Sequence, residues 1–148
     1  MAAPQTKVYG TAQKHLDADV DWVSDTIKCT LHTSTYSPNQ STHEFASSLT
    51  NELSTANGYT VGGATLGTKS VNVSGLVTQY RAAATTWTAS GSLTARYAVV
   101  WKDTGSAATS PLLAYVLLDS APADVTATNA AFTITWDATD GVFKVTAS

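Results

Sequence analysis

Hydrophobic and polar residues alternate along most of the chain, and a period of two predicts β-strands. Between residues 26 and 32, Ile27, Cys29 and Leu31 alternate with polar neighbours, as expected for a strand with one buried face. The same period dominates from residue 65 onward. Further strands are expected within residues 65–73, 76–80, 84–89, 92–102, 131–136 and 142–146, and the unbroken apolar run at 111–118 predicts a strand buried on both faces.

Two segments near the N-terminus have the spacing of a helix instead. In residues 11–23 and 43–53, apolar side chains recur every three or four positions, which places them on one helical face. They are Leu16, Val20 and Val23 in the first segment, and Phe45, Leu49 and Leu53 in the second.

These elements predict a mainly β fold, an antiparallel β-sandwich or small barrel of about seven or eight strands, with one or two short N-terminal helices. Asn57-Gly58, Gly62-Gly63 and Asp140-Gly141 are turn signals between the strands. Residues 1–10 are small and polar, with Pro4 and Gly10, and predict an extended N-terminal arm. Residues 11–148 are expected to form a single domain.

The composition favours contact with other proteins. Charged residues make up 13% of the 148 residues, about half the usual share of roughly 25%. Serine and threonine take their place, and a partner covers hydroxyl groups at a lower desolvation cost than charges. The net charge of −3 argues against a nucleic-acid partner. Neither a membrane-spanning stretch nor the apolar core of a signal peptide is seen, so we expect a protein that is not secreted.

Candidate metal ligands lack the spacing that a metal site needs. The Asp17, Asp19 and Asp21 run resembles the start of a calcium loop, but Trp22 stands where that loop requires glycine. An acidic face on a short helix explains the run better. No HxH or HxxxH spacing connects the three histidines, which are expected to be isolated surface or strand-end residues: His15, His32 and His43.

Candidate nucleophiles and aromatic residues also favour structure over catalysis. The lone Cys29 lies within the apolar alternation of its strand, as a small buried hydrophobic residue would. No GxSxG or phosphate-binding glycine motif is present, so we expect no catalytic site, metal or cofactor. The four tryptophans are expected in the core or at its edge, with subunit contact or sugar binding as the alternatives: Trp22, Trp87, Trp101 and Trp136.

Two stretches carry a resemblance to a known group of proteins. Residues 26–66 contain TIKCTLHTSTYSP, then THEF, then NEL and GYTVGG, and residues 95–119 contain ARYAVVWKDTG followed by SPLLAY. In their order and spacing these motifs resemble a family of tailed-bacteriophage virion structural proteins, over about residues 20–140. The resemblance implies a virion component without enzymatic activity, assembled in the host cytoplasm.

Within that family, the composition suits a capsid decoration or cement protein that binds and stabilises the outer shell. Its expected partners are the major capsid protein and copies of itself in a trimer. The arm would become ordered on docking, and the arm and residues 34–44 would carry the contacts. The predicted contact residues are Pro4, Lys7, Tyr9, Tyr36, Pro38, His43 and Trp87.

Two alternatives stay open. A tail-side component, such as a tail tip, baseplate or fibre-base domain, would contact the host and bind a surface glycan through an exposed aromatic groove. A hydrolase whose site is assembled from distant residues is the other class. Neither alternative has a local motif in the sequence.

Overall fold

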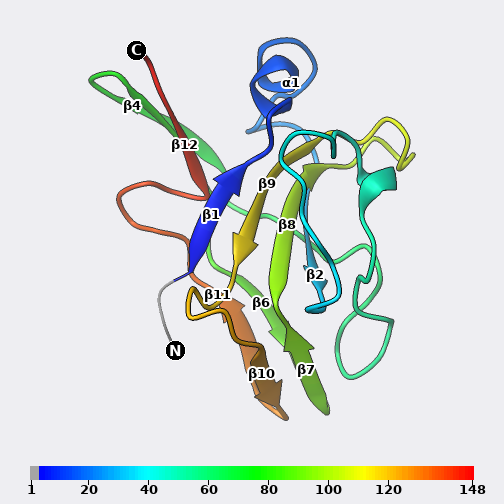
Figure 1. Ribbon diagram of the computed structural model, residues 1–148. Helices are drawn as coiled ribbons and strands as arrows, with labels where there is room; N and C mark the ends of the chain where they lie inside the picture. Colours follow the sequence, from blue (N-terminus) through cyan, green and yellow to red (C-terminus); the bar gives the residue numbers. More distant parts are fainter. Residues whose placement is uncertain (1–3) are drawn as a thin grey trace.

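The fold is mainly β, as the alternation predicts. A computed structural model describes residues 4–148, of which strands make up 42% and helices 7%, and all the strand pairs are antiparallel. The strands form a sandwich-like arrangement with a single short α-helix at one end (Figure 1).

A five-stranded sheet forms one layer and is the framework of the molecule. Its strands follow the order β1-β9-β8-β2-β3. Their bounds are β1 (Gln5–Val8), β2 (Ile27–His32), β3 (Ala64–Thr65), β8 (Tyr97–Lys102) and β9 (Leu112–Leu117). Strand β8 lies between β2 and β9, so the segments that carry the quoted motifs are hydrogen-bonded neighbours.

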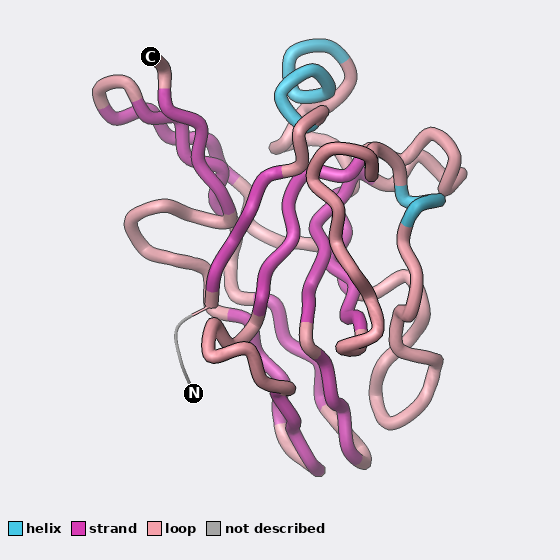
Figure 2. Tube along the Cα trace, in the orientation of Figure 1, coloured by secondary structure: helices cyan, strands magenta, loops and turns pink. Residues whose placement is uncertain are grey.

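Three smaller sheets make up the rest of the β structure. They are β12-β5-β4, β11-β6 and β10-β7, formed by β4 (Ser70–Ser74), β5 (Val77–Arg81), β6 (Thr85–Thr88), β7 (Ser92–Ala95), β10 (Val125–Thr128), β11 (Ala131–Ile134) and β12 (Phe143–Thr146). The tip of the β12-β5-β4 sheet projects from the body of the protein, whereas the β7 and β10 strands extend at the opposite end (Figure 2).

The main core lies on the inner face of the five-stranded sheet. Ile27, Cys29 and Leu31 are fully buried there, as the alternation predicts. Aromatic rings complete the core, where the ring centre of Trp87 lies 6.1 Å from that of Tyr59 and 6.1 Å from that of Phe132. Strand β9 is buried on both faces, which confirms the expectation for the apolar run at 111–118.

The second predicted helix is wrong. Residues 43–53 contain only a 3₁₀ turn, Ala46–Ser48, and the N-terminal helix is confined to Ala12–Ala18 (α1). The cause is tertiary pairing: Leu112 donates its backbone N–H to the Glu44 carbonyl, and Leu53 donates to the Leu31 carbonyl. These bonds hold the segment extended along the sheet, and they outweigh its helical spacing.

The predicted arm is part of the domain over residues 5–10, which contradicts ordering only on docking. Gln5–Val8 pair with β9 along their whole length, and the Tyr9 side chain is 1% exposed. Gln40 donates its side-chain N–H to the Val8 carbonyl on the open side of β1. The first three residues of the predicted arm lie outside the described residues.

The sequence also underestimates the number of strands, which is twelve over the described residues. The predicted strand at 92–102 is divided at Arg96, where the backbone N–H bonds the His32 carbonyl and the carbonyl accepts from Leu118. On either side of this point β7 and β8 pair with different strands. A period of two cannot reveal such a change of partner.

Gly63 allows the closest approach between a turn and the five-stranded sheet. A Cβ atom there would lie 2.0 Å from the Cys29 carbonyl oxygen, whereas the neighbouring Gly62 has open space around it. Both residues have a positive φ. We therefore expect Gly63→Ala to lower the free energy of unfolding by at least about 2 kcal/mol more than Gly62→Ala. Chemical denaturation of the two variants measures this difference, and equal losses would contradict it.

Candidate functional site

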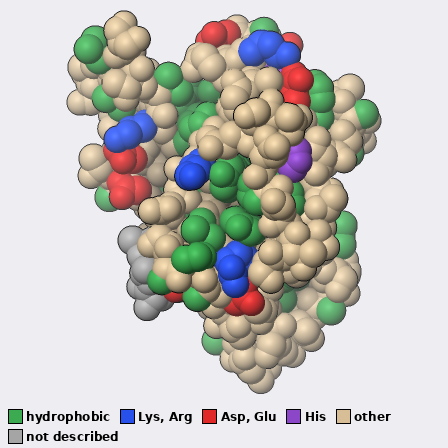
Figure 3. All heavy atoms as spheres, viewed as in Figure 1, with side chains coloured by type: hydrophobic (Ala, Val, Ile, Leu, Met, Phe, Trp, Pro, Cys, Tyr) green, Lys and Arg blue, Asp and Glu red, His purple; other side chains and the backbone are tan. Residues whose placement is uncertain are grey.

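The outer face of the five-stranded sheet carries a connected group of aromatic side chains. Because side chains alternate along a strand, Lys7, Tyr97 and Tyr115 point away from the Ile27 side of the sheet. Lys7 lies opposite Tyr115 in the pairing of β1 with β9. In Figure 3, hydrophobic side chains gather over the middle of this face, with charged side chains around them.

Residues 33–45 cross this outer face and cover part of it. Tyr36 lies on the sheet with its ring centre 5.9 Å from that of Tyr97 and 4.9 Å from that of His32. Its hydroxyl is 2.8 Å from the Tyr9 hydroxyl and 3.3 Å from Nδ1 of His43. These bonds join β1 to the covering segment across the sheet.

A hollow of about 240 Å³ remains between the covering segment and β1. Its lining includes two tyrosines, one ammonium group, one amide and one serine hydroxyl, a set suited to contact with a neutral or mildly acidic protein surface. The residues that line it are Gln5, Lys7, Ser37, Pro38, Tyr97, Tyr115 and Leu117.

Tyr9, Tyr36 and Tyr115 on this face stay neutral over the physiological pH range. Burial raises the pKa of Tyr9, and its hydrogen bond with Tyr36 raises it further. Burial also raises the pKa values of Tyr36 and Tyr115 above the usual 10. The phenols therefore serve as hydrogen-bonding groups and not as bases, and Lys7 provides the charge at the hollow.

His32 packs beneath the covering segment against Tyr36, and it hydrogen-bonds the backbone that follows this segment. Its Nδ1 lies 2.8 Å from the Thr50 carbonyl, to which it donates, and its Nε2 accepts from the Thr30 hydroxyl at 2.9 Å. Trp101 donates its indole N–H to the same hydroxyl oxygen. His32 does end a strand, as the sequence predicts, but it is fully buried and not at the surface. Burial lowers the pKa of this imidazole.

Since His32 is buried in its neutral form, acid should weaken the fold. The unfolded chain takes up a proton near the ordinary pKa of 6.5, whereas the folded chain does so only at lower pH. The free energy of unfolding should therefore be constant above pH 7 and fall below 6.5, by up to about 1.4 kcal/mol per pH unit. Denaturation curves between pH 7.5 and 5.5 measure the slope.

The matched variant is His32→Asn, whose amide can still donate toward the Thr50 carbonyl but does not titrate. It should be less stable at pH 7.5, and its stability should change less with pH than that of the wild type. Equal slopes in the two proteins would show that another group causes the acid effect.

Five of the seven predicted contact residues come together on the outer face. Lys7 and Pro38 line the hollow, while Tyr9, Tyr36 and His43 form the hydrogen-bonded chain beside it. Tyr9 and Tyr36 are buried, so they support the surface and do not reach a partner themselves.

The structure does not place Trp87 at a surface. Its side chain is 6% exposed, and its ring packs in the core behind the sheet. The strand alternation around Trp87 predicts one buried face, but it does not show that this face is the side with the tryptophan.

Sequence reasoning missed Tyr97 and Tyr115 as residues that line the hollow, where Tyr97 is partly exposed and Tyr115 is 9% exposed. Tyr97 lies in a predicted strand, yet nothing local shows which face is covered. Tyr115 lies inside the apolar run at 111–118, which gives no alternation from which to infer its direction. The pairing of β1 with β9 is what brings Lys7 beside it.

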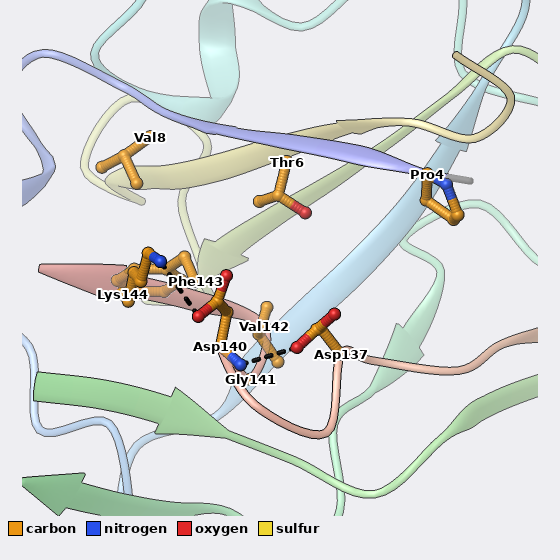
Figure 4. A pocket seen from close by; sticks show the side chains of 9 residues that line it. All are labelled: Pro4, Thr6, Val8, Asp137, Asp140, Gly141, Val142, Phe143 and Lys144. Carbon is orange, nitrogen blue, oxygen red and sulfur yellow. Dashed lines mark hydrogen bonds and ion pairs between the residues drawn. The ribbon is translucent and has the colours of Figure 1, made fainter. Parts of the chain in front are cut away.

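A second concavity, of about 320 Å³, separates β1 from the turn at residues 137–144. Pro4, the remaining predicted contact residue, lines one wall with Thr6 and Val8, and two aspartates lie on the other wall (Figure 4). Asp140 pairs with Lys144 at 3.0 Å. This groove is separate from the aromatic hollow.

Asp137 holds the turn at this groove through its carboxylate. Its carboxylate accepts backbone N–H groups of Thr139 and Asp140, each at 2.7 Å, and these bonds lower its pKa. Gly141 has a φ of 76° and bonds back to the Asp137 carbonyl. The predicted Asp140-Gly141 turn is therefore confirmed.

The acidic run near α1 is divided among separate local contacts. Asp17 accepts from Gln13, Asp19 bonds His15, and Asp21 accepts the N–H groups of Val23 and Ser24. His15 is buried, unlike the surface residue predicted from the sequence, and its other nitrogen bonds Glu44 at 3.0 Å. Over residues 4–148, no group of three or more potential ligands is arranged to hold a metal ion.

Comparison of the chain with family models, curated proteins and solved structures gives no match. The resemblance to phage virion proteins therefore stays a prediction from the quoted motifs. Within the described part of the chain, no helix is long and apolar enough to cross a membrane.

Proposed function

We propose that this chain is a non-enzymatic structural protein of a tailed-bacteriophage virion, which decorates the outer shell and stabilises it. The outer face of the five-stranded sheet is the surface that docks. The observation that carries the proposal is the hollow beside Lys7, where Tyr97 and Tyr115 stand on a rigid sheet.

The motifs behind the resemblance support this assignment because they meet in one place. TIKCTLH forms β2, ARYAVVWK contains β8, and SPLLAY enters β9, all in the five-stranded sheet. The TSTYSP and THEF segments lie in the covering segment over the same sheet. A shared docking face would account for similarity concentrated in these segments.

The physical character of the face also suits adhesion. Tyrosine provides a large contact area with few rotatable bonds, and it is enriched where proteins meet. The chain of hydrogen bonds through Tyr36 holds the covering segment in place before binding, so little ordering entropy is lost on docking. Lys7 adds one positive charge for an acidic group on the partner.

The partners in this proposal are the major capsid protein and further copies of this chain in a trimer. A trimer presents three docking faces at once, and contacts that are weak one at a time hold firmly together. Bridging neighbouring subunits of a shell in this way raises the force needed to separate them.

A charge reversal at the hollow tests the docking face. Lys7→Glu replaces an exposed side chain and should lower the affinity for purified shells that lack this protein at least tenfold, about 1.4 kcal/mol. Lys144→Glu makes the same change in charge at an exposed residue of the β12-β5-β4 sheet, away from the outer face and the hollow, and should bind like the wild type. Co-sedimentation with shells over a range of concentrations measures both.

Failure of the wild type to bind shells would contradict the decoration role. Equal losses in the two variants would contradict the assignment of the hollow. The copy number per virion separates the remaining alternative, because shell decoration requires on the order of hundreds of copies and a tail tip or baseplate about three to twelve. Binding of a host glycan would favour the tail-side role.

A further inference from the structure

Strand β4 is an unprotected sheet edge at the tip of the projecting sheet. Among the described strands β5 is its sole neighbour, and all five residues of β4 are exposed. Val71 and Val73 are 44% and 66% exposed, and Leu76 in the adjoining turn is 69% exposed. Figure 1 shows this hairpin pointing away from the body, where a second molecule can reach it.

The hairpin geometry determines which backbone groups face the open side. A two-residue turn at Gly75-Leu76 joins Ser74 to Val77, and such a turn is closed by a hydrogen-bonded pair. Since hydrogen-bonded and non-bonded pairs alternate in antiparallel strands, Asn72 also bonds toward β5. The N–H and C=O groups of Val71 and Val73 therefore point outward from the sheet.

Nothing in β4 blocks a further strand from pairing there. Exposed edges in monomeric proteins usually carry a charge, a proline or a bulge that prevents such pairing. Ser70–Ser74 contain no charged residue and no proline, and their register with β5 is continuous. By contrast, the side-chain amide of Gln40 donates a hydrogen bond to the Val8 carbonyl on the open side of β1, so this carbonyl is already partnered.

The sequence of β4 is the same in both directions, Ser-Val-Asn-Val-Ser. We propose that β4 binds the β4 strand of a second copy of this chain, antiparallel and centred on Asn72. In this register each Val71 lies opposite the partner's Val73, and Ser70 lies opposite Ser74. Each residue lies opposite a residue of the same type, and no like charges are brought together.

The outward backbone groups fit this register. Val71 and Val73 are the residues that present N–H and C=O groups, and each of the two valine pairs exchanges both hydrogen bonds. Asn72 then faces its own copy as the non-bonded pair at the two-fold axis. The two three-stranded sheets become one continuous sheet across the axis.

The contact is small, so it should be weak between free molecules. A pair of five-residue strands buries less than the 1,200 Å² or so of a stable interface. Its strength grows when copies are held close together, because the second contact is then intramolecular. It uses a surface separate from the aromatic hollow, does not depend on the virion role, and is compatible with linking two trimers.

A register-specific cross-link tests the contact. In an Asn72→Cys variant the two cysteines would face each other across a non-bonded pair, about 4.5 Å apart at Cα, within the range that a disulfide spans. Ser70→Cys is the matched control, also exposed, but its copies would lie about 13 Å apart. Cys29 is fully buried and does not compete.

Under mild oxidation, Asn72→Cys should form a covalent dimer at least tenfold faster than Ser70→Cys. Equal rates would overturn the proposed pairing. This assay requires no shells, so its failure is distinguishable from failure of the docking proposal.

Sedimentation equilibrium up to about 1 mM should show a concentration-dependent dimer of the wild type. Val73→Pro removes an outward N–H that β5 does not use, and it should abolish the dimer, whereas Val73→Thr should retain it. A wild type that stays monomeric, or a dimer that persists in Val73→Pro, would overturn the inference.

Discussion

The pairing of β8 with both β2 and β9 is the interaction on which the rest of the structure depends. It creates a sheet whose central strands are buried on both faces, so every polar group on the outer side needs a partner. Thr30, His32 and Tyr36 meet this requirement through a connected set of hydrogen bonds and ring contacts. The covering segment is therefore fastened to the sheet and not loosely placed over it.

This constraint also explains the character of the proposed docking face. Burial keeps Tyr9, Tyr36 and Tyr115 neutral, and packing on a sheet limits their rotation, so the face presents a defined shape before any partner arrives. The tyrosines that fill the space between the sheet and the covering segment thus also support the proposed docking face.

The sequence predicts the fold class well because alternation is a local signal. Cys29 in the core, strand β9 buried on both sides and the turn at Gly141 all follow from residues within a few positions of one another. The failures are tertiary in origin. Residues 43–53 are held extended by backbone bonds to distant strands, β1 pairs with a strand more than a hundred residues away, and Tyr115 acquires its direction from that pairing.

The open sides of β1 and β4 differ in a way that limits growth of an assembly. Gln40 caps a carbonyl on β1, which disfavours head-to-tail stacking of β4 of one molecule on β1 of the next. In the proposed β4 contact, each open edge is paired once two molecules bind, because a two-fold contact uses the same strand of both molecules. Within one pair of chains, the exposed apolar edge is thus covered and no free β4 edge is left.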